Sequence, residues 1–158
     1  MSRPTLLPDV IDALITLFGA NSMGATVFDG YSATADEPNL YVMVGVENPD
    51  ITSGASSGGT DQTWAYVGAQ ANGRRQRNEN ITVNCGIVSW DGGSSQKNVR
   101  DKAFQLFQSL TDAIEHDPTL GGIVLFVSGI SNFRLMQNSS ETGVSSIITF
   151  TVQAQARP

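Results

Sequence analysis

The fold is decided by the stretch from Glu79 to Val127, which reads ENITVNCGIVSWDGGSSQKNVRDKAFQLFQSLTDAIEHDPTLGGIVLFV. In its first part, apolar residues alternate with polar or small ones, at Ile81, Val83, Cys85 and Ile87. The spacing then becomes helical, with one apolar face formed by Val99, Ala103, Leu106, Phe107, Leu110, Ala113 and Ile114. A last apolar run, from Ile123 to Val127, is typical of a strand. This change of period predicts strand, helix and strand, with the helix packed on a sheet.

The flanking sequence predicts a second helix and more strands. A broad apolar face from Leu7 to Phe18, with Pro8 in the first turn, predicts the helix. Strands are expected at Ala25–Asp29, Leu40–Val46, Gln62–Gln70, Gly122–Val127, Ser131–Asn138 and Val144–Ala156. The unbroken apolar run Leu40–Val46 should be covered on both faces. The last strand should have one core face and one polar face, as in an antiparallel sheet.

The dipeptide Asn72-Gly73 predicts a tight turn between two strands, because a two-residue turn needs positive φ at both positions. The resulting register places Trp64 opposite Ile81 and Tyr66 opposite Glu79. The predicted fold is therefore α+β, with a mostly antiparallel mixed sheet, two main helices packed on one face and a long projecting β-hairpin.

The tip of this hairpin would carry the tightest basic cluster of the chain, Arg74, Arg75 and Arg77. Arginines on a projecting ribbon are good anchors for carboxylates of a neighbouring molecule. Charges that protect a strand end from unwanted pairing are the alternative explanation.

The segment Glu47–Thr60 is rich in glycine and serine and predicts a long mobile loop. A loop of this length inside a compact domain is commonly functional or ordered by a partner. We therefore take Glu47 and Asp50, together with the arginine cluster, as candidate partner contacts.

The length, composition and net charge of the chain restrict the possible classes of protein. The length of 158 residues and an apolar fraction of 40% predict a single domain, residues 1–158. The net charge is −6, and residues 1–61 contain eight acidic residues but one basic residue. Nucleic-acid binding through phosphates would need clustered Lys and Arg instead. Uneven charge suits head-to-tail contact between copies, although ordinary solubilising charge is the alternative. We expect neither a signal peptide nor a membrane span.

No pattern of residues predicts catalysis, a cofactor or a metal. A hydrolytic triad needs a nucleophile, a base and an orienting acid. Cys85, the only cysteine, falls on the core face of a strand, and His116, the only histidine, lies at a helix end. Trp64 and Tyr66 leave open a small ligand-binding domain as an alternative. The chain is therefore expected not to be an enzyme.

Several segments resemble the tail terminator, or tail completion, proteins of long, flexible-tailed bacteriophages. These segments are PDVIDALITLF, RNENITVNCGIVSWDGG, QKNVRDKAFQLFQSLTDAIEHDP, GIVLFVSGISNFRLMQ and SSIITFTVQAQARP. The resemblance is one of pattern and order, and it covers nearly the whole chain.

The resemblance implies a non-enzymatic virion protein that assembles in the host cytoplasm. It would form a ring, expected to be a homohexamer, on the end of the tail tube. The ring would stop tube polymerisation and contact the head–tail connector, while DNA passes through its lumen without specific binding. A head-completion or neck connector protein of the same virion is the alternative.

Overall fold

The computed structural model describes residues 4–30, 38–46, 58–66 and 75–158, with only the backbone for 58–66 and 75–77. The fold is α+β, as predicted. In chain order, the elements are α1 (Leu7–Ala20), β1 (Thr26–Asp29), β2 (Leu40–Val44), β3 (Gly58–Tyr66), β4 (Arg75–Asp91), α2 (Gln96–His116), β5 (Phe126–Ser140) and β6 (Gly143–Ala156).

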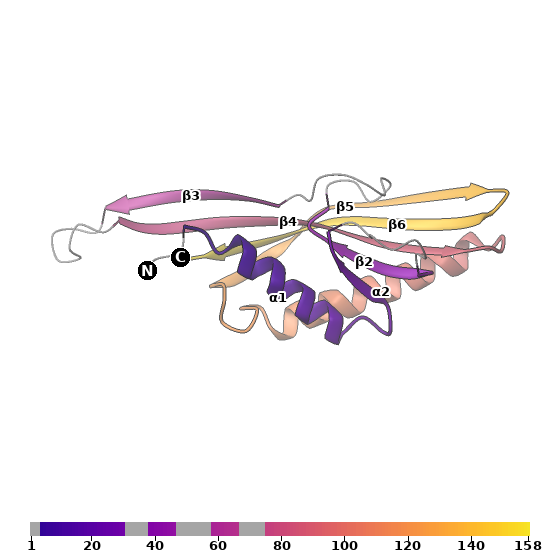
Figure 1. Ribbon diagram of the computed structural model, residues 1–158, viewed down its shortest axis with the longest axis horizontal. Coiled ribbons are helices and arrows are strands. Elements are labelled where there is room, and N and C mark those ends of the chain that lie inside the picture. The colour runs from indigo at the N-terminus through magenta and orange to yellow at the C-terminus, as the bar shows by residue number, and fades with distance from the viewer. Residues whose placement is uncertain (1–3, 31–37, 47–57, 67–74) are drawn as a thin grey trace.

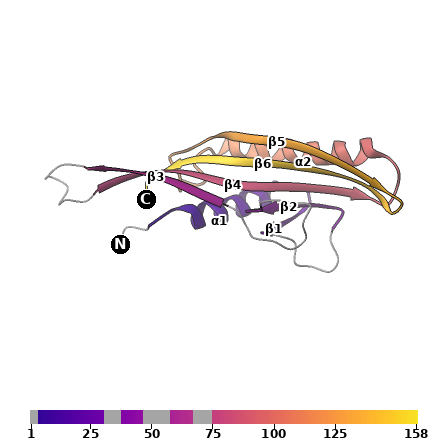
Figure 2. The same cartoon turned by 90° about the horizontal axis from the view of Figure 1, so that it is seen from above.

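Strand β4 runs along the centre of the sheet, between β6 on one side and β2 and β3 on the other (Figures 1 and 2). The strand order is β1-β2-β4-β6-β5, and only β1 and β2 are parallel neighbours among the described strands. β6 pairs with one edge of β4 from Glu79 to Asp91. The other edge is shared, because β3 pairs with Arg75–Val83 and β2 pairs with Cys85–Ser89.

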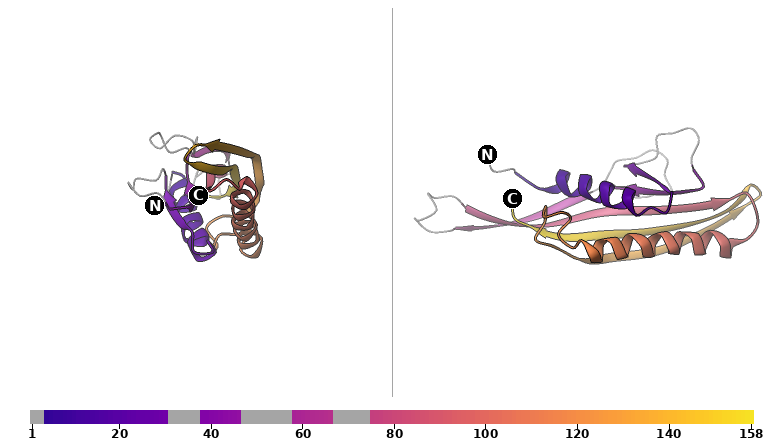
Figure 3. Two further views of the ribbon diagram at one scale, coloured as in Figure 1. Left: turned by 90° about the vertical axis from the view of Figure 1, so that its right-hand side faces the viewer. Right: turned by 90° about the horizontal axis from the view of Figure 1, so that it is seen from below.

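Both helices lie on the same face of the sheet, side by side, as the end-on view shows (Figure 3). α1 buries Val10, Leu14 and Phe18. α2 is capped by Ser95, whose Oγ accepts a hydrogen bond from the Asn98 N–H at 3.4 Å. The apolar faces read from the sequence are thus the faces that pack on the sheet. None of the helices in the described part of the chain is long and apolar enough to cross a membrane.

β2 is covered on both faces, as its apolar run predicts. Val42 and Val44 belong to the main core beneath the helices, whereas Tyr41 and Met43 belong to a smaller cluster on the opposite face. Ile147 of β6 joins this smaller cluster and is only 5% exposed. The prediction of a polar second face for the last strand is therefore wrong at this end of β6.

The predicted register of β3 against β4 is wrong by four residues. Trp64 lies opposite Arg77, and the position opposite Ile81 is taken by Thr60. β3 also begins at Gly58, so the end of the predicted loop Glu47–Thr60 is a strand. Residues 47–57 and the predicted turn at Asn72-Gly73 lie outside the described residues, so the two-residue turn and the hairpin connection stay predictions.

Two predicted elements near the end of the chain form one strand instead. The first residues of the apolar run Ile123–Val127 lie in turns and not in a strand. Just before them, Leu120, Gly121 and Gly122 all have positive φ. β5 then runs without a break from Phe126 to Ser140, and so joins the predicted strands Gly122–Val127 and Ser131–Asn138. It adapts to β6 through two register shifts, at Val127/Gly129 and Ser131/Arg134. β5 and β6 form a terminal hairpin, with Ser140 paired to Gly143.

Candidate interaction surfaces

The two potentially reactive side chains considered from the sequence lie in unlike environments. Cys85 is buried in the main core, and desolvation raises its pKa to about 12, so the thiol is protonated at neutral pH. His116 is exposed in the last turn of α2, where its Nδ1 lies 2.7 Å from the carbonyl oxygen of Asp112. Neither position suits a nucleophile and its base.

Acidic side chains also do not converge on a metal site in the part of the chain that the structure describes. No three His, Cys, Asp or Glu side chains there are grouped as they would be around a metal ion.

The predicted partner contacts are only partly within the described residues. Arg75 and Arg77 lie in β4, opposite Tyr66 and Trp64. Their side chains, like those of β3, belong to the stretches of which only the backbone is described. Arg74, Glu47 and Asp50 lie outside the described residues, so these candidate contacts stay predictions.

The backbone of β3 and β4 nevertheless places two of these arginines beyond the main sheet. The pairing of β4 with β6 stops at Glu79, while the pairing with β3 continues through Asn78, Arg77, Gln76 and Arg75. Four residue pairs at about 3.3 Å per residue give a two-stranded extension about 13 Å long. This extension reaches past the end of α1, as Figure 1 shows.

A groove runs between α1 on one side and the C-terminal part of α2 with the turn after it on the other. Two adjoining hollows of about 410 and 380 Å³ share Leu17 and Asp117. We define the interhelical groove by Asp12, Leu17, Asp112, Ala113, His116 and Asp117. Apolar groups lie along its length and three carboxylates line it.

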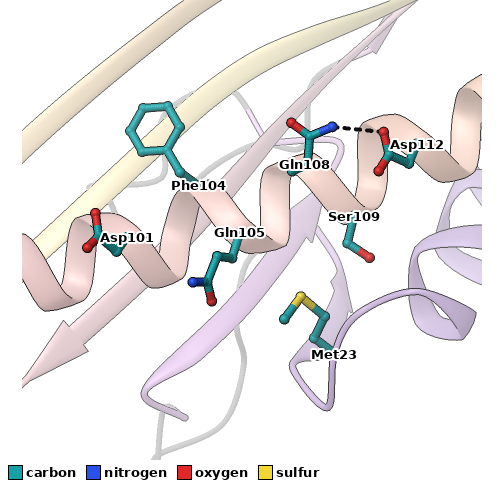
Figure 4. Close-up of a pocket in the computed structure, with 7 residues that line it drawn as sticks. All are labelled: Met23, Asp101, Phe104, Gln105, Gln108, Ser109 and Asp112. Carbon is teal, nitrogen blue, oxygen red and sulfur yellow. Dashed lines mark hydrogen bonds between the residues drawn. The ribbon is translucent and has the colours of Figure 1, made fainter.

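A third hollow, of about 560 Å³, continues the groove along α2 and shares Asp112 with it. Figure 4 shows Gln105 and Ser109 on the side of α2 where Met23 lies, and Gln108 hydrogen-bonded to Asp112. The Gln108 Nε2 to Asp112 Oδ1 distance is 2.8 Å. Met23 itself is 62% exposed, which is unusual for a large apolar side chain.

A row of phenylalanines connects the core with the surface beside α2. Phe150 contacts Phe18 and Phe107 in the core layer, and Phe107 contacts Phe133 at a ring-centroid distance of 5.1 Å. Phe133 also contacts Phe104, and these last two side chains are 45% and 36% exposed. The register shift of β5 at Ser131/Arg134, with Asn132 at φ 53°, accompanies this placement of Phe133.

Glu79 is a structurally important residue that sequence reasoning did not single out. Its side chain is only 1% exposed, and its carboxylate accepts hydrogen bonds from Thr5 Oγ1 and from the Leu6 N–H, the latter at 3.0 Å. A carboxylate is favourable at the positive N-terminal end of α1. Its position offered a signal, because Glu79 shares the alternation of Ile81 and Val83, the apolar face of β4.

Comparison with protein-family models and with curated proteins finds no match to this chain.

Proposed function

We propose that this chain is the tail terminator of a long, flexible-tailed bacteriophage. It would form a ring on the end of the tail tube, stop tube polymerisation and provide the surface for the head–tail connector. The observation that carries the proposal is the order of the elements. A helix, short strands, a long strand pair, a second helix and a terminal hairpin follow one another as the resemblance implies.

The shape of the subunit supports assembly into a ring. A ring with one kind of subunit needs two different surfaces that bind each other, because every copy contacts one neighbour through each. The two-stranded extension of β3 and β4 and the interhelical groove are two such unlike surfaces on one chain.

The charge supports a passive role toward DNA. The chain has a net charge of −6, and a lumen of this sign would let the phosphate backbone slide without binding.

Loss of the protein from the phage tests this function. Without it, tail tubes should grow beyond their normal length and remain unattached to heads, and supplying the protein in trans should restore both features. Gold labelling of intact particles should mark the head-proximal end of the tube. Tails of normal length in its absence would contradict the proposal, and label at the portal with normal tails would favour a head-completion protein.

A further inference from the structure

The interhelical groove carries negative charge that the described residues leave unbalanced. Asp12, Asp112 and Asp117 line it, and none of the three makes an ion pair within the described part of the chain. By contrast, Asp101 farther along α2 pairs with Lys97. Asp112 accepts a hydrogen bond from the Gln108 amide, and Asp117 accepts from the Gly121 N–H and the Thr119 hydroxyl, all of which are neutral donors. The groove therefore has free acceptor capacity for a cationic partner.

The floor of the groove gives this charge a specific setting. Leu17 and Ala113 line it together with the carboxylates and present apolar surface. A partner that combines cationic groups with apolar or planar surface fits such a groove better than a simple ion does. Guanidinium groups have both properties, because they bind carboxylates in a bidentate manner and are more weakly hydrated than ammonium groups.

The chain itself contains a matching segment. Arg74, Arg75 and Arg77 are the tightest basic cluster in the sequence. Arg75 and Arg77 lie in the part of β4 that extends beyond β6. In Figures 1 and 3, this end of β4 extends away from α2, so a neighbouring copy is its natural receptor.

We propose that the β3–β4 end of one copy docks in the interhelical groove of the next, with its arginines on Asp12 and Asp112. This inference rests on the proposed function, because it names the contact that would join subunits of the ring. The contact is heterologous, so it closes into a ring when the rotation per subunit permits. Nucleic acid is a poor occupant, since its phosphates would meet three carboxylates.

A charge-swap experiment tests this contact. One variant carries Arg74→Glu, Arg75→Glu and Arg77→Glu, and a second carries Asp12→Arg and Asp112→Arg. Each variant alone places like charges together at every contact, and we expect its assembly to weaken by roughly 100-fold. Mixed in equal amounts, the two variants have opposite charges at every contact when they alternate, so assembly of a ring with an even number of subunits should be restored.

Multi-angle light scattering of each variant and of the mixture gives the readout, with circular dichroism to confirm folding. The matched control is Glu115→Arg with Glu141→Arg, two exposed carboxylates outside the groove, and it should assemble like the wild type. High salt should weaken wild-type assembly, because the charges are at the surface.

Three results would overturn the inference. If wild type and both variants assemble equally, the contact lies elsewhere, while the ring and the proposed function remain. If both variants are monomeric and the mixture is also monomeric, the two charged surfaces do not meet. A wild type that stays monomeric with tail tubes present would overturn both the contact and the proposed function.

Discussion

Glu79 joins the start of α1 to the sheet through a buried, hydrogen-bonded carboxylate. We expect Glu79→Gln to lower the free energy of unfolding by about 1.5–3 kcal/mol, because an amide retains one acceptor oxygen and loses the charge. Urea unfolding followed by circular dichroism measures the change. Glu115→Gln, at an exposed site on α2, is the control and should change stability by less than about 0.5 kcal/mol. Equal stability of the two variants would show that the Glu79 contacts contribute nothing.

Cys85 should be chemically silent in the folded protein. Its buried thiol has a pKa of about 12, compared with 9.0 when solvated, and the thiolate is the reactive form. A chromogenic disulfide reagent should therefore leave the native protein unmodified at pH 8. In urea, it should react with one thiol per chain. Rapid reaction without denaturant would contradict the buried position.

The same shift sets the direction of a pH effect. The pKa of Cys85 is raised in the folded state, so folding favours the protonated thiol. Its contribution to stability is complete below about pH 9 and is lost as the pH rises toward 12. A Cys85→Ser variant should lack this part of the alkaline loss in urea titrations at several pH values.

At the residue scale, the sequence predicted which side chains are buried better than it predicted their hydrogen-bond partners. Alternation along β4 placed Cys85 in the core correctly, because burial depends on the local period. The hydrogen bond from the Leu6 N–H to the Glu79 carboxylate joins residues 73 positions apart, and no local sequence pattern predicts such a contact.

Among the elements, the β5–β6 hairpin depends on a very close approach of two backbones. A Cβ atom on Gly143 would lie 2.2 Å from the Asp91 carbonyl oxygen, and its φ of 146° is one that glycine tolerates best. We expect Gly143→Ala to destabilise the protein by about 1–3 kcal/mol. Gly92→Ala is the matched control, since its Cβ would meet nothing closer than 3.9 Å. Thermal unfolding of both variants measures the difference, and equal melting temperatures would contradict the close approach.

Because of the row of phenylalanines, truncation of Phe107 to alanine should destabilise the protein far more than truncation of Phe104. Phe107→Ala removes ring contacts with both Phe133 and Phe150, and we expect a loss of about 3–5 kcal/mol. Phe104→Ala, one turn earlier and 36% exposed, should cost about 1 kcal/mol or less. Chemical denaturation of the pair tests the helix face, and similar losses would mean that the face is misassigned.

Helices were easier to predict than the strand after α2. The spacing of α1 and α2 carries both a period and cap signals, such as Pro8 and Ser95. The run from Ile123 to Val127 is only five residues long, and Val124 is buried without being in a strand. Short apolar runs do not distinguish a strand from a buried turn by period alone.

For the whole molecule, the sequence predicted the layers but not the register. Two helices on one face of a mixed sheet follow from apolar faces that must be covered. The register of β3 was predicted from a local turn signal, and the observed pairing differs by four residues. A register shift by an even number of residues leaves every side chain of β3 on the same face of the sheet. The pattern of apolar and polar faces therefore could not exclude the wrong register.

Of the two surfaces in the proposed contact, the sequence predicted one and not the other. The arginine cluster is contiguous in sequence and was identified there. The groove combines Asp12 with Asp112 and Asp117, from two helices about 100 residues apart, so only the packing of α1 beside α2 brings its carboxylates together.

We expect the protein to form a ring that recognises the end of a tail tube. Electron micrographs of the purified protein mixed with tail tubes test this most directly. We expect six-fold rings, free or seated on one end of each tube, and tubes capped in this way should not elongate when more tube subunits are added. Particles of monomer size, with bare tube ends that continue to grow, would contradict the account.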